Sequence, residues 1–374
     1  MNWWAIAGLV AGLVVLEGGP ARAALGRLPM VRRLGGSATS AISGRSKDMP
    51  AIPLQPVDRV RVTMLVDNAT DVLLPDEGPV RRWGWGGSAG KPPILSSAIT
   101  EDGKTVDSLR AEHGFSALVE LHVDGNARRV LFDAGATPDG LIGNLDRLDL
   151  PPDSFEAIVF SHGHWDHVLG LDGVARRLGR SNMPVILHPD FWTRRRLTAP
   201  NGDFDLPTPS RAAIEGVGFT IVEDRRPSFL LDDRMLVTGE VERTTEFERG
   251  MPPAHQAWRD GGWQPDPLVH DDQAVVLHVR DKGLVVLTGC GHSGIVNIVR
   301  HARRLTGVDR VYAVLGGFHL RGGPIIDQTV AALAEAAPGV LVPAHCTSWR
   351  AHAALAAAFP GVYQPGGVGA QVDL

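Results

Sequence analysis

A dense cluster of histidines directly after an apolar run constrains this chain more than any other feature. Residues 157–167 read AIVFSHGHWDH, and residues 169–178 read as a helical segment. A short apolar run that ends in polar residues is typical of a buried strand. Three imidazoles and one carboxylate should therefore project from a tight loop at the carboxyl end of a strand: His162, His164, Asp166 and His167.

The mixture of side chains in this loop predicts a metal centre. Nitrogen and carboxylate ligands together suit zinc, iron or manganese better than calcium or magnesium. A structural zinc site would place four ligands on one ion, whereas this loop can supply two ligands to each of two ions. We therefore expect the chemistry of the protein to lie at this loop.

Strand and helix patterns alternate along most of the chain. Apolar and β-branched runs predict strands at 59–66, 116–123, 129–132, 157–160, 185–188, 273–279, 283–288, 310–315 and 340–342. Helical patterns occupy 141–148, 169–178, 295–305, 329–337 and 351–359. This order predicts an α/β layered domain with sheets flanked by helices.

Residues 191–270 are the exception, because they show no clear period and contain several prolines. We predict a long irregular insertion there, and ordered loops of such length are usually lids or binding segments. Three tryptophans in it could stack on a flat heterocycle or pack within the protein: Trp192, Trp258 and Trp263.

Composition and charge exclude several classes of protein. Hydrophobic residues make up 44% of the 374 residues and charged residues 21%, which excludes wholesale disorder and a polytopic membrane protein. The formal net charge of −5 gives no basic footprint, so nucleic acid is not an expected partner. Cys290 and Cys346 are the two cysteines of the sequence, so one disulfide at most can form.

The amino terminus differs from the rest. Residues 1–25 form a hydrophobic N-terminal segment, and residues 26–58 form a linker ahead of the domain predicted at 59–374. The apolar run at residues 3–16 would rise about 21 Å as a helix, which is short for a membrane span. Three interpretations stay open: a signal peptide, a weak membrane anchor that leaves a cytoplasmic catalytic domain, or a true start at Met49. We favour the cytoplasmic domain, with weak membrane association through 3–16, and export stays open.

The histidine loop resembles the signature of the metallo-β-lactamase fold superfamily, His162-x-His164-x-Asp166-His167. Asp133, at the end of an earlier strand, resembles the aspartate that supports this loop in the superfamily. The resemblance implies an αββα sandwich over about residues 59–374. Further segments resemble the branch typified by 7,8-dihydropterin-6-methyl-4-(β-ribofuranosyl)aminobenzene-5′-phosphate synthase: VDNAT (66–70), AEHGFSALVE (111–120), DDQAVV (271–276), LTGCGHSGIVNIVRHARRLTGV (287–308), VLGGFHL (314–320) and PAHCT (343–347).

The resemblance also implies two divalent ions, with zinc expected first and iron or manganese as alternatives. The superfamily commonly has a metal-bridging aspartate in a TGD sequence, but here Thr288-Gly289 is followed by Cys290. The bridge is then a thiolate, absent, or replaced by His292. We predict His292 and His345 as further metal ligands. We expect Asp166 to orient the water and a metal, and to act as base or acid if only one metal is bound.

Other residues are assigned to the surroundings of the metals. We expect Cys290, His319 and Asp133 to bind metal or to support the ligands, and we consider three residues as substrate contacts: His113, Asn68 and His188. The remaining histidines are interpreted as solvated or structural: 122, 255, 270, 278, 301 and 352.

These features predict a dinuclear metal-dependent enzyme that acts on a phosphorylated or diphosphorylated small molecule. In the resembled branch, a pterin methyl group is transferred to an aryl ring with loss of diphosphate, which makes the reaction a transfer. Two alternatives stay open. One is a generic metallohydrolase of esters, lactones or phosphodiesters. The other is a metal-binding regulatory protein without turnover, suggested by the missing TGD aspartate. The sequence leaves the oligomeric state undetermined.

Overall fold

The computed structural model describes residues 32–33, 51, 53–179 and 181–374. The hydrophobic N-terminal segment, including residues 3–16, lies outside the described residues, so its interpretations stay predictions. Within the described part, no helix has the length and apolar character that a membrane crossing requires.

The first sheet contains β2 (Arg59–Val66), β3 (Val80–Arg81), β6 (Ser116–Val123), β7 (Asn126–Phe132), β8 (Ala157–Val159), β9 (Pro184–Leu187), β12 (Thr220–Glu223) and β21 (Gln371–Asp373). Its order across the described residues is β12-β9-β8-β7-β6-β2-β21-β3. The second sheet contains β1 (Arg32–Arg33), β13 (Ser228–Leu230), β14 (Met235–Val237), β17 (Ala274–Val279), β18 (Gly283–Thr288), β19 (Val311–Gly317) and β20 (Val340–Ala344). Its order is β1-β13-β14-β17-β18-β19-β20.

The two sheets pack face to face, and their inner faces form one continuous core. Val119 and Phe132 of the first sheet belong to the same buried cluster as Val285 and Leu315 of the second. Strands with apolar residues on both faces, such as β18, are covered on both sides. The core therefore lies between the sheets, and the site is built where their loops meet.

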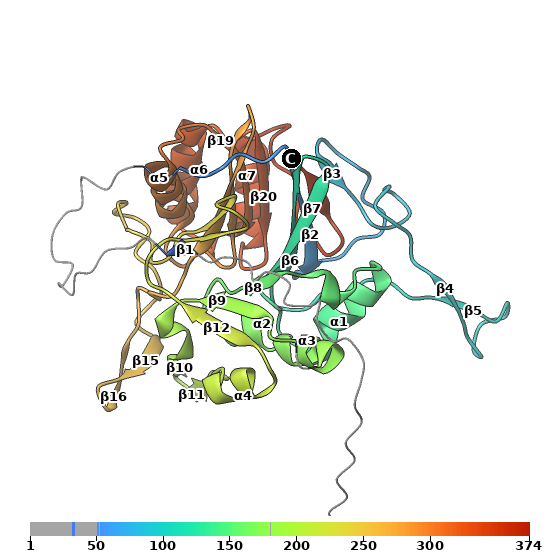
Figure 1. Cartoon of the computed structure of the whole chain (residues 1–374), viewed down its shortest axis with the longest axis horizontal. Coiled ribbons are helices and arrows are strands. Elements are labelled where there is room, and N and C mark those ends of the chain that lie inside the picture. The colour runs from blue at the N-terminus through green and yellow to red at the C-terminus, as the bar shows by residue number, and fades with distance from the viewer. Residues whose placement is uncertain (1–31, 34–50, 52, 180) are drawn as a thin grey trace, which may run out of the picture.

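Helices cover the outer face of each sheet (Figure 1). The first sheet carries α1 (Pro138–Arg147), α2 (Trp165–Val168) and α3 (Leu171–Leu178), and the second carries α5 (Ile295–Thr306), α6 (Ile325–Ala336) and α7 (Trp349–Ala358). Local sequence explains their ends: Thr137 and Ser348 accept backbone N–H groups as N-caps, and Gly307 ends α5 with a φ of 68°. The predicted αββα sandwich is confirmed.

The segment predicted as irregular is more regular than its sequence indicates. It contains α4 (Arg211–Gly216). Two short 3-10 helices lie nearby in the chain: η1 (Pro152–Ser154) precedes β8, and η2 (Pro189–Trp192) follows β9. Four strands form a small separate sheet in the order β11-β10-β15-β16: β10 (Arg195–Ala199), β11 (Gly202–Asp205), β15 (His255–Arg259) and β16 (Gly262–Pro265). Strands β12, β13 and β14 extend the two main sheets. These strands are short and several pair with distant residues, so no local period reveals them.

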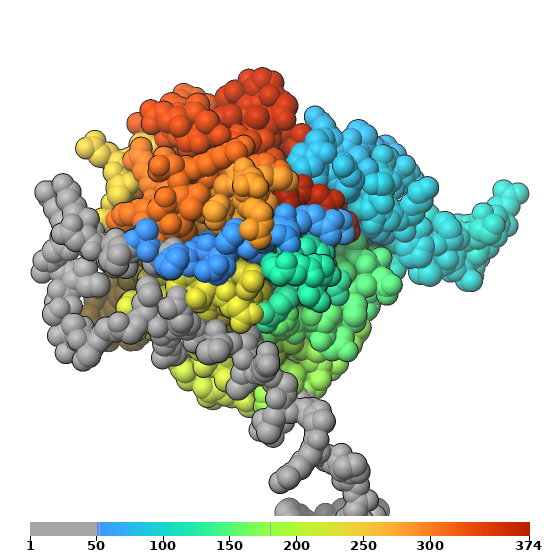
Figure 2. Space-filling view, turned by 45° about the horizontal axis from the view of Figure 1, so that its top comes forward, coloured from blue at the N-terminus to red at the C-terminus, as the bar shows by residue number. Residues whose placement is uncertain are grey.

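Two further parts of the chain lie outside the strands and helices expected from the sequence. Strands β4 (Ile94–Ser96) and β5 (Lys104–Val106) form a hairpin that projects from the body (Figure 1). The end of the predicted linker lies against the domain, because Val57 is buried and its N–H donates to the carbonyl of His278 (2.8 Å). Figure 2 shows this segment, in blue, crossing the face of the molecule. Val57, at the end of the predicted linker, is therefore packed against the domain.

Candidate metal centre

The candidate ligands lie in loops that follow the carboxyl ends of parallel strands. Strand β8 is parallel to β7 and leads into the histidine loop, residues 161–167. Strands β18, β19 and β20 are parallel to one another and lead to Cys290, His319 and His345 respectively. Because carboxyl ends of parallel strands share one edge, residues far apart in sequence meet there.

Three histidine nitrogens converge in the first ligand group. His162 Nε2 lies 2.9 Å from His164 Nδ1, and His292 Nε2 lies 3.2 Å and 3.1 Å from these two atoms. Nitrogens bound to one tetrahedral zinc ion at about 2.1 Å would lie about 3.4 Å apart, so these three atoms are spaced to hold one ion. Burial first, and neighbouring positive charge second, lower the pKa of all three imidazoles, which keeps them in the neutral form that binds metal.

A second group adjoins the first and mixes ligand types. Its ligand atoms come from Asp166, His167, Cys290 and His345, and all lie within 4.8 Å of one another. His167 Nε2 is 3.1 Å from Cys290 Sγ, and His345 Nε2 is 3.4 Å from Asp166 Oδ2. His345 Nε2 is buried and has no hydrogen-bond partner among the described residues, which leaves its lone pair available for an ion.

Cys290 also belongs to a third, overlapping set with His292 and His319. The thiol therefore stands between the two main groups, at the sequence position where the superfamily commonly has an aspartate. The ring of His319 lies 4.4 Å from that of His292, and neither of its buried ring nitrogens has a hydrogen-bond partner in the described part of the chain. Both cysteines are free thiols, and Cys346 Sγ donates to the Cys290 carbonyl (3.2 Å).

Asp133 supports the histidine loop through hydrogen bonds with Ser161 and His167. Its Oδ1 accepts the backbone N–H of Ser161 (2.7 Å), and its Oδ2 lies 2.7 Å from both Ser161 Oγ and His167 Nδ1. Burial disfavours a charged His167, but the carboxylates of Asp133 and Asp166 outweigh burial and raise the His167 pKa to about 9. A carboxylate on Nδ1 leaves Nε2 of this imidazole directed at the second group.

The charge of Asp166 is favoured by its neighbours. Burial alone would raise the pKa of this carboxyl, but His167 and His345 outweigh it and hold the pKa below its ordinary value. His113 approaches from the solvent side, with Nε2 at 3.5 Å from Asp166 Oδ2 and a side chain that is 60% exposed. Asp166 is thus an ionised, buried group on the side of the centre where His113 is exposed.

Of the three predicted substrate contacts, only His113 presents an exposed ring at the centre. Asn68 Oδ1 accepts from His345 Nδ1 (3.0 Å), so this amide orients a candidate ligand. His188 is buried elsewhere, and its Nδ1 accepts the N–H of Asp190 at the start of η2 (3.0 Å). The structure groups it with none of the other candidate residues that it describes.

Several supporting residues were missed from the sequence. His255, interpreted as solvated or structural, is fully buried, and its Nε2 lies 2.9 Å from His164 Nε2. Burial first lowers its pKa, so its imidazole is neutral. Three aspartates accept backbone N–H groups of the ligand loops: Asp67 from His345 (2.8 Å), Asp271 from Gly163 (2.8 Å) and Asp272 from Ser293 (2.7 Å). The VDNAT and DDQAVV segments carry these aspartates, but their partners are distant in sequence.

The tryptophans of the insertion pack with arginines. Trp258 and Trp263 lie 5.4 Å apart across β15 and β16, and Arg194 lies over both rings. Trp192 donates to Glu223 Oε1 (2.6 Å) and packs against the core beneath the first sheet. Their contacts therefore favour the packing interpretation of these side chains.

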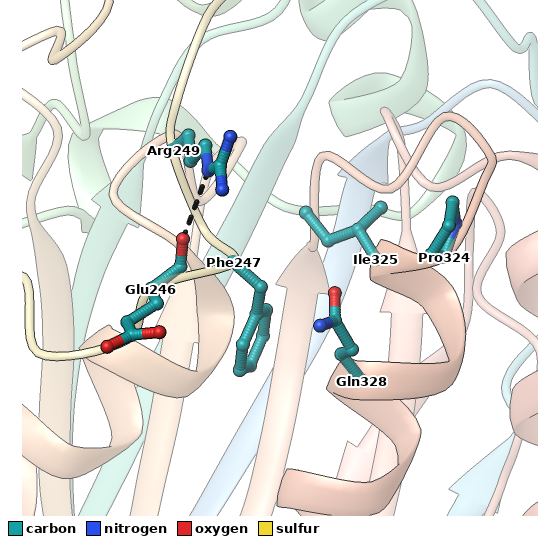
Figure 3. Close-up of a pocket in the computed structure, with 6 residues that line it drawn as sticks. All are labelled: Glu246, Phe247, Arg249, Pro324, Ile325 and Gln328. Carbon is teal, nitrogen blue, oxygen red and sulfur yellow. Dashed lines mark hydrogen bonds between the residues drawn. The ribbon is translucent and has the colours of Figure 1, made fainter.

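A cleft of about 510 Å³ opens beside the starts of α5 and α6. The ring of Phe247 lies opposite Ile325 and Gln328 across it (Figure 3). Its loop wall is fixed by the buried Glu248, whose carboxylate accepts the N–H groups of Val296 (2.8 Å) and Asn297 (2.9 Å) on α5. Because α5 and α6 begin after β18 and β19, the cleft lies at the same edge of the sheet as the candidate ligands.

The comparisons with known proteins agree with this geometry. The family model described as the metallo-beta-lactamase superfamily matches residues 109–305. The chain is 29% identical to 7,8-dihydropterin-6-methyl-4-(beta-D-ribofuranosyl)-aminobenzene-5'-phosphate synthase of Methanocaldococcus jannaschii over 246 residues, 64% of this chain and 83% of that protein. An uncharacterized protein of the same organism is 32% identical over 257 residues, 68% of this chain and 91% of that protein.

A solved structure is similar over most of the fold. It is that of Tm1679, described as a metal-dependent hydrolase of the beta-lactamase superfamily, with 25% identity and a TM-score of 0.60. The similarity covers 84% of this chain and 99% of that protein. With the sandwich, the histidine loop and the matched family model together, the chain belongs to the metallo-beta-lactamase superfamily.

Proposed function

We propose that this protein is a dinuclear metalloenzyme that acts on a phosphorylated or diphosphorylated small molecule. The observation that carries the proposal is the pair of adjoining ligand groups, three converging imidazole nitrogens beside an Asp, His, Cys and His set. His162, His164 and His292 would hold one ion. Asp166, His167 and His345 would hold the other, with the Cys290 thiol between them. Zinc suits this donor set best, and iron or manganese are the alternatives.

The chemistry expected of such a centre follows from charge. A pair of divalent ions would lower the pKa of bound water, bind phosphate oxygens and offset the charge that develops when a P–O bond, or the C–O bond to a diphosphate leaving group, breaks. The residues of this chain then position the reacting groups. Asp166 is kept ionised by its neighbours, so its Oδ2 would bind an ion or orient a bound water by accepting a hydrogen bond from it. His113, 3.5 Å from that oxygen, can donate a hydrogen bond to a bound phosphate.

We assign the organic part of such a substrate to the cleft beside α6, which is lined by residues outside the ligand groups. Its volume of about 510 Å³ falls in the usual range for small-molecule sites. Phe247 and Ile325 supply apolar walls, and the amide of Gln328 supplies a donor and an acceptor. The name of the 29% identical synthase supports a phosphorylated substrate. The description of Tm1679 supports a hydrolase as the second candidate.

Metal analysis of protein purified without added metal tests the dinuclear centre first. We expect about two equivalents of a transition metal per chain, and less than one equivalent would overturn the proposal. A panel of phosphomonoesters, phosphodiesters, lactones and pterin diphosphates then separates the candidates. Release of diphosphate with formation of a new C–C or C–N bond identifies a transferase, whereas turnover of lactones or simple esters alone identifies the hydrolase.

A further inference from the structure

A line of buried polar side chains runs from the small four-stranded sheet to the histidine loop. His255, the first residue of β15, is fully buried. Its Nε2 lies 2.9 Å from His164 Nε2, and its Nδ1 lies 3.1 Å from the carbonyl oxygen of Asp266. These two contacts place His255 between a fixed backbone acceptor and a candidate metal ligand.

The direction of the hydrogen bonds along this line is determined by the backbone carbonyl of Asp266, where the line ends. A carbonyl oxygen only accepts, so His255 Nδ1 must donate to Asp266. A neutral imidazole has one N–H, so His255 Nε2 accepts, and His164 Nε2 must be the donor to it. The lone pair of His164 is then on Nδ1, the atom that faces His162 Nε2 and His292 Nε2 at 2.9 Å and 3.1 Å.

We propose that His255 is a positioning residue that fixes His164 in the tautomer with Nδ1 free to bind the metal ion. The proposal rests on the proposed function, because it concerns a ligand of the same centre. It assigns to the inserted sheet a part in the metal site, although His255 and His164 are 91 residues apart. Partners of this kind, one step outside the ligands, fix ring orientation and increase ligand basicity.

A second contact from the same sheet supports this assignment. Arg195 on β10 is only 2% exposed and donates from Nε to Asp266 Oδ2 (3.1 Å). Its guanidinium also pairs with Asp271, whose Oδ2 accepts the N–H of Gly163 (2.8 Å). One arginine therefore holds the residue that orients His255 and the residue that holds the loop backbone next to His164.

The test compares His255→Leu with His255→Gln. Leucine removes the acceptor for His164 Nε2, whereas glutamine can present Oε1 in its place. Metal affinity is measured by competition with a chromophoric chelator, and the ligand geometry by the visible absorption of the Co²⁺-substituted protein. We expect His255→Leu to weaken one of the two metal equivalents about 10- to 100-fold and to change the Co²⁺ spectrum. We expect His255→Gln to retain affinity within about threefold of the wild-type value.

His301→Leu is the matched control, because His301 is another buried histidine and its contacts, with Arg304 on its own helix α5 and with the backbone of Thr238, involve no residue of the ligand groups. Equal metal affinity in His255→Leu and His301→Leu would overturn the proposal. Equal losses in His255→Leu and His255→Gln would overturn it too, because they would assign His255 a packing role.

A measurement on the wild-type protein remains decisive even if a variant does not fold. Two-bond ¹H–¹⁵N correlation spectra of histidine-labelled protein report which ring nitrogen carries hydrogen. We expect Nε2–H for His164 and Nδ1–H for His255 in the metal-free protein, and Nδ1–H on His164 would refute the proposal. If wild-type protein binds no metal, the proposed function fails, but these tautomers still decide the present inference.

Discussion

The two ligand groups of the centre differ in charge although they adjoin one another. The first consists of three neutral imidazoles, because burial and neighbouring positive charge lower their pKa values. The second contains the ionised Asp166 and lies against Asp133, and these carboxylates raise the pKa of His167 to about 9. One group therefore consists of uncharged donors, whereas the other combines the Asp166 carboxylate with an imidazole whose protonation the carboxylates favour.

This difference in charge predicts different roles for the two ligand groups, which are called the neutral half and the charged half. A divalent ion held by neutral imidazoles keeps its full charge and is the stronger electrophile, whereas a carboxylate and a thiolate partly neutralise the charge of an ion. Access differs in the same sense. The first group is backed by the buried His255, while the second has the exposed ring of His113 beside Asp166. If both groups hold ions as proposed, the neutral half (His162, His164 and His292) would bind and polarise the substrate, and the charged half (Asp166, His167, Cys290 and His345) would orient bound water.

Removal of the neutral half should have the largest effect. The double change His162→Ala with His164→Ala leaves His292 alone in its group. We expect metal content to fall from about two equivalents to about one, and turnover to fall about 1,000-fold or more, which is roughly 4 kcal/mol of lost stabilisation. Metal analysis and steady-state kinetics measure both. His278→Ala, on β17 away from the centre, is the control, and two retained equivalents in the double variant would contradict the assignment of this group.

A substitution in the small four-stranded sheet, at Arg195 on β10, tests the contacts that support the first ligand group. Arg195→Met removes a guanidinium that pairs with two buried carboxylates, Asp266 and Asp271. Loss of one partner leaves buried charge unpaired, so we expect the free energy of unfolding to fall by about 3–5 kcal/mol. Arg225→Met, which removes a half-exposed pair with Asp190, should cost no more than about 1 kcal/mol. Chemical denaturation measures both, and equal losses would show that the buried network does not stabilise the site.

The sequence predicts the candidate ligands of the histidine loop better than the residues that support them, such as His255. The ligands in His162 to His167 are adjacent in sequence, so one strand and its loop suffice to place them. The strand at 59–66 and the helix beginning at Ile295 also match the structure, because their apolar periods are uninterrupted. His255 could not be assigned, because it reaches His164 through a short strand whose partners are distant in sequence.

Glycine and proline explain the smaller errors. The strand predicted at 310–315 continues to Gly317, because Gly316 and Gly317 pair with Pro343 and Ala344 although glycine usually indicates a turn. Helix α6 begins at Ile325 rather than 329, because Pro324 starts a helix that the preceding glycines conceal. For β19 tertiary pairing, which a single sequence does not display, decides the boundary, whereas for α6 the local Pro324 decides it.

His301, a buried histidine outside the centre, shows the effect of burial on a histidine pKa without the influence of the ligand groups. Burial lowers the pKa of His301 to about 4, against an ordinary value of 6.5. A histidine with a depressed folded pKa contributes stability above pH 6.5, and this contribution is lost as the pH falls toward 4. We expect wild-type protein to lose about 3 kcal/mol more than His301→Leu between pH 7 and pH 4. Unfolding curves at several pH values measure this, and parallel losses in both proteins would show that His301 does not titrate as burial requires.

The smallest expected effect concerns which ion the centre prefers. Cys290 stands where the superfamily commonly has an aspartate, and a thiolate favours softer ions than a carboxylate does. We expect Cys290→Asp to raise the affinity for Mn²⁺ relative to Zn²⁺ by about tenfold, or about 1.4 kcal/mol. Competition titrations with both ions measure the ratio. Cys346→Ser is the control, because Cys346 belongs to neither main ligand group in the described residues. An unchanged ratio in Cys290→Asp would mean that the thiol does not bind the ion, and the two halves would then differ in charge through their carboxylates alone.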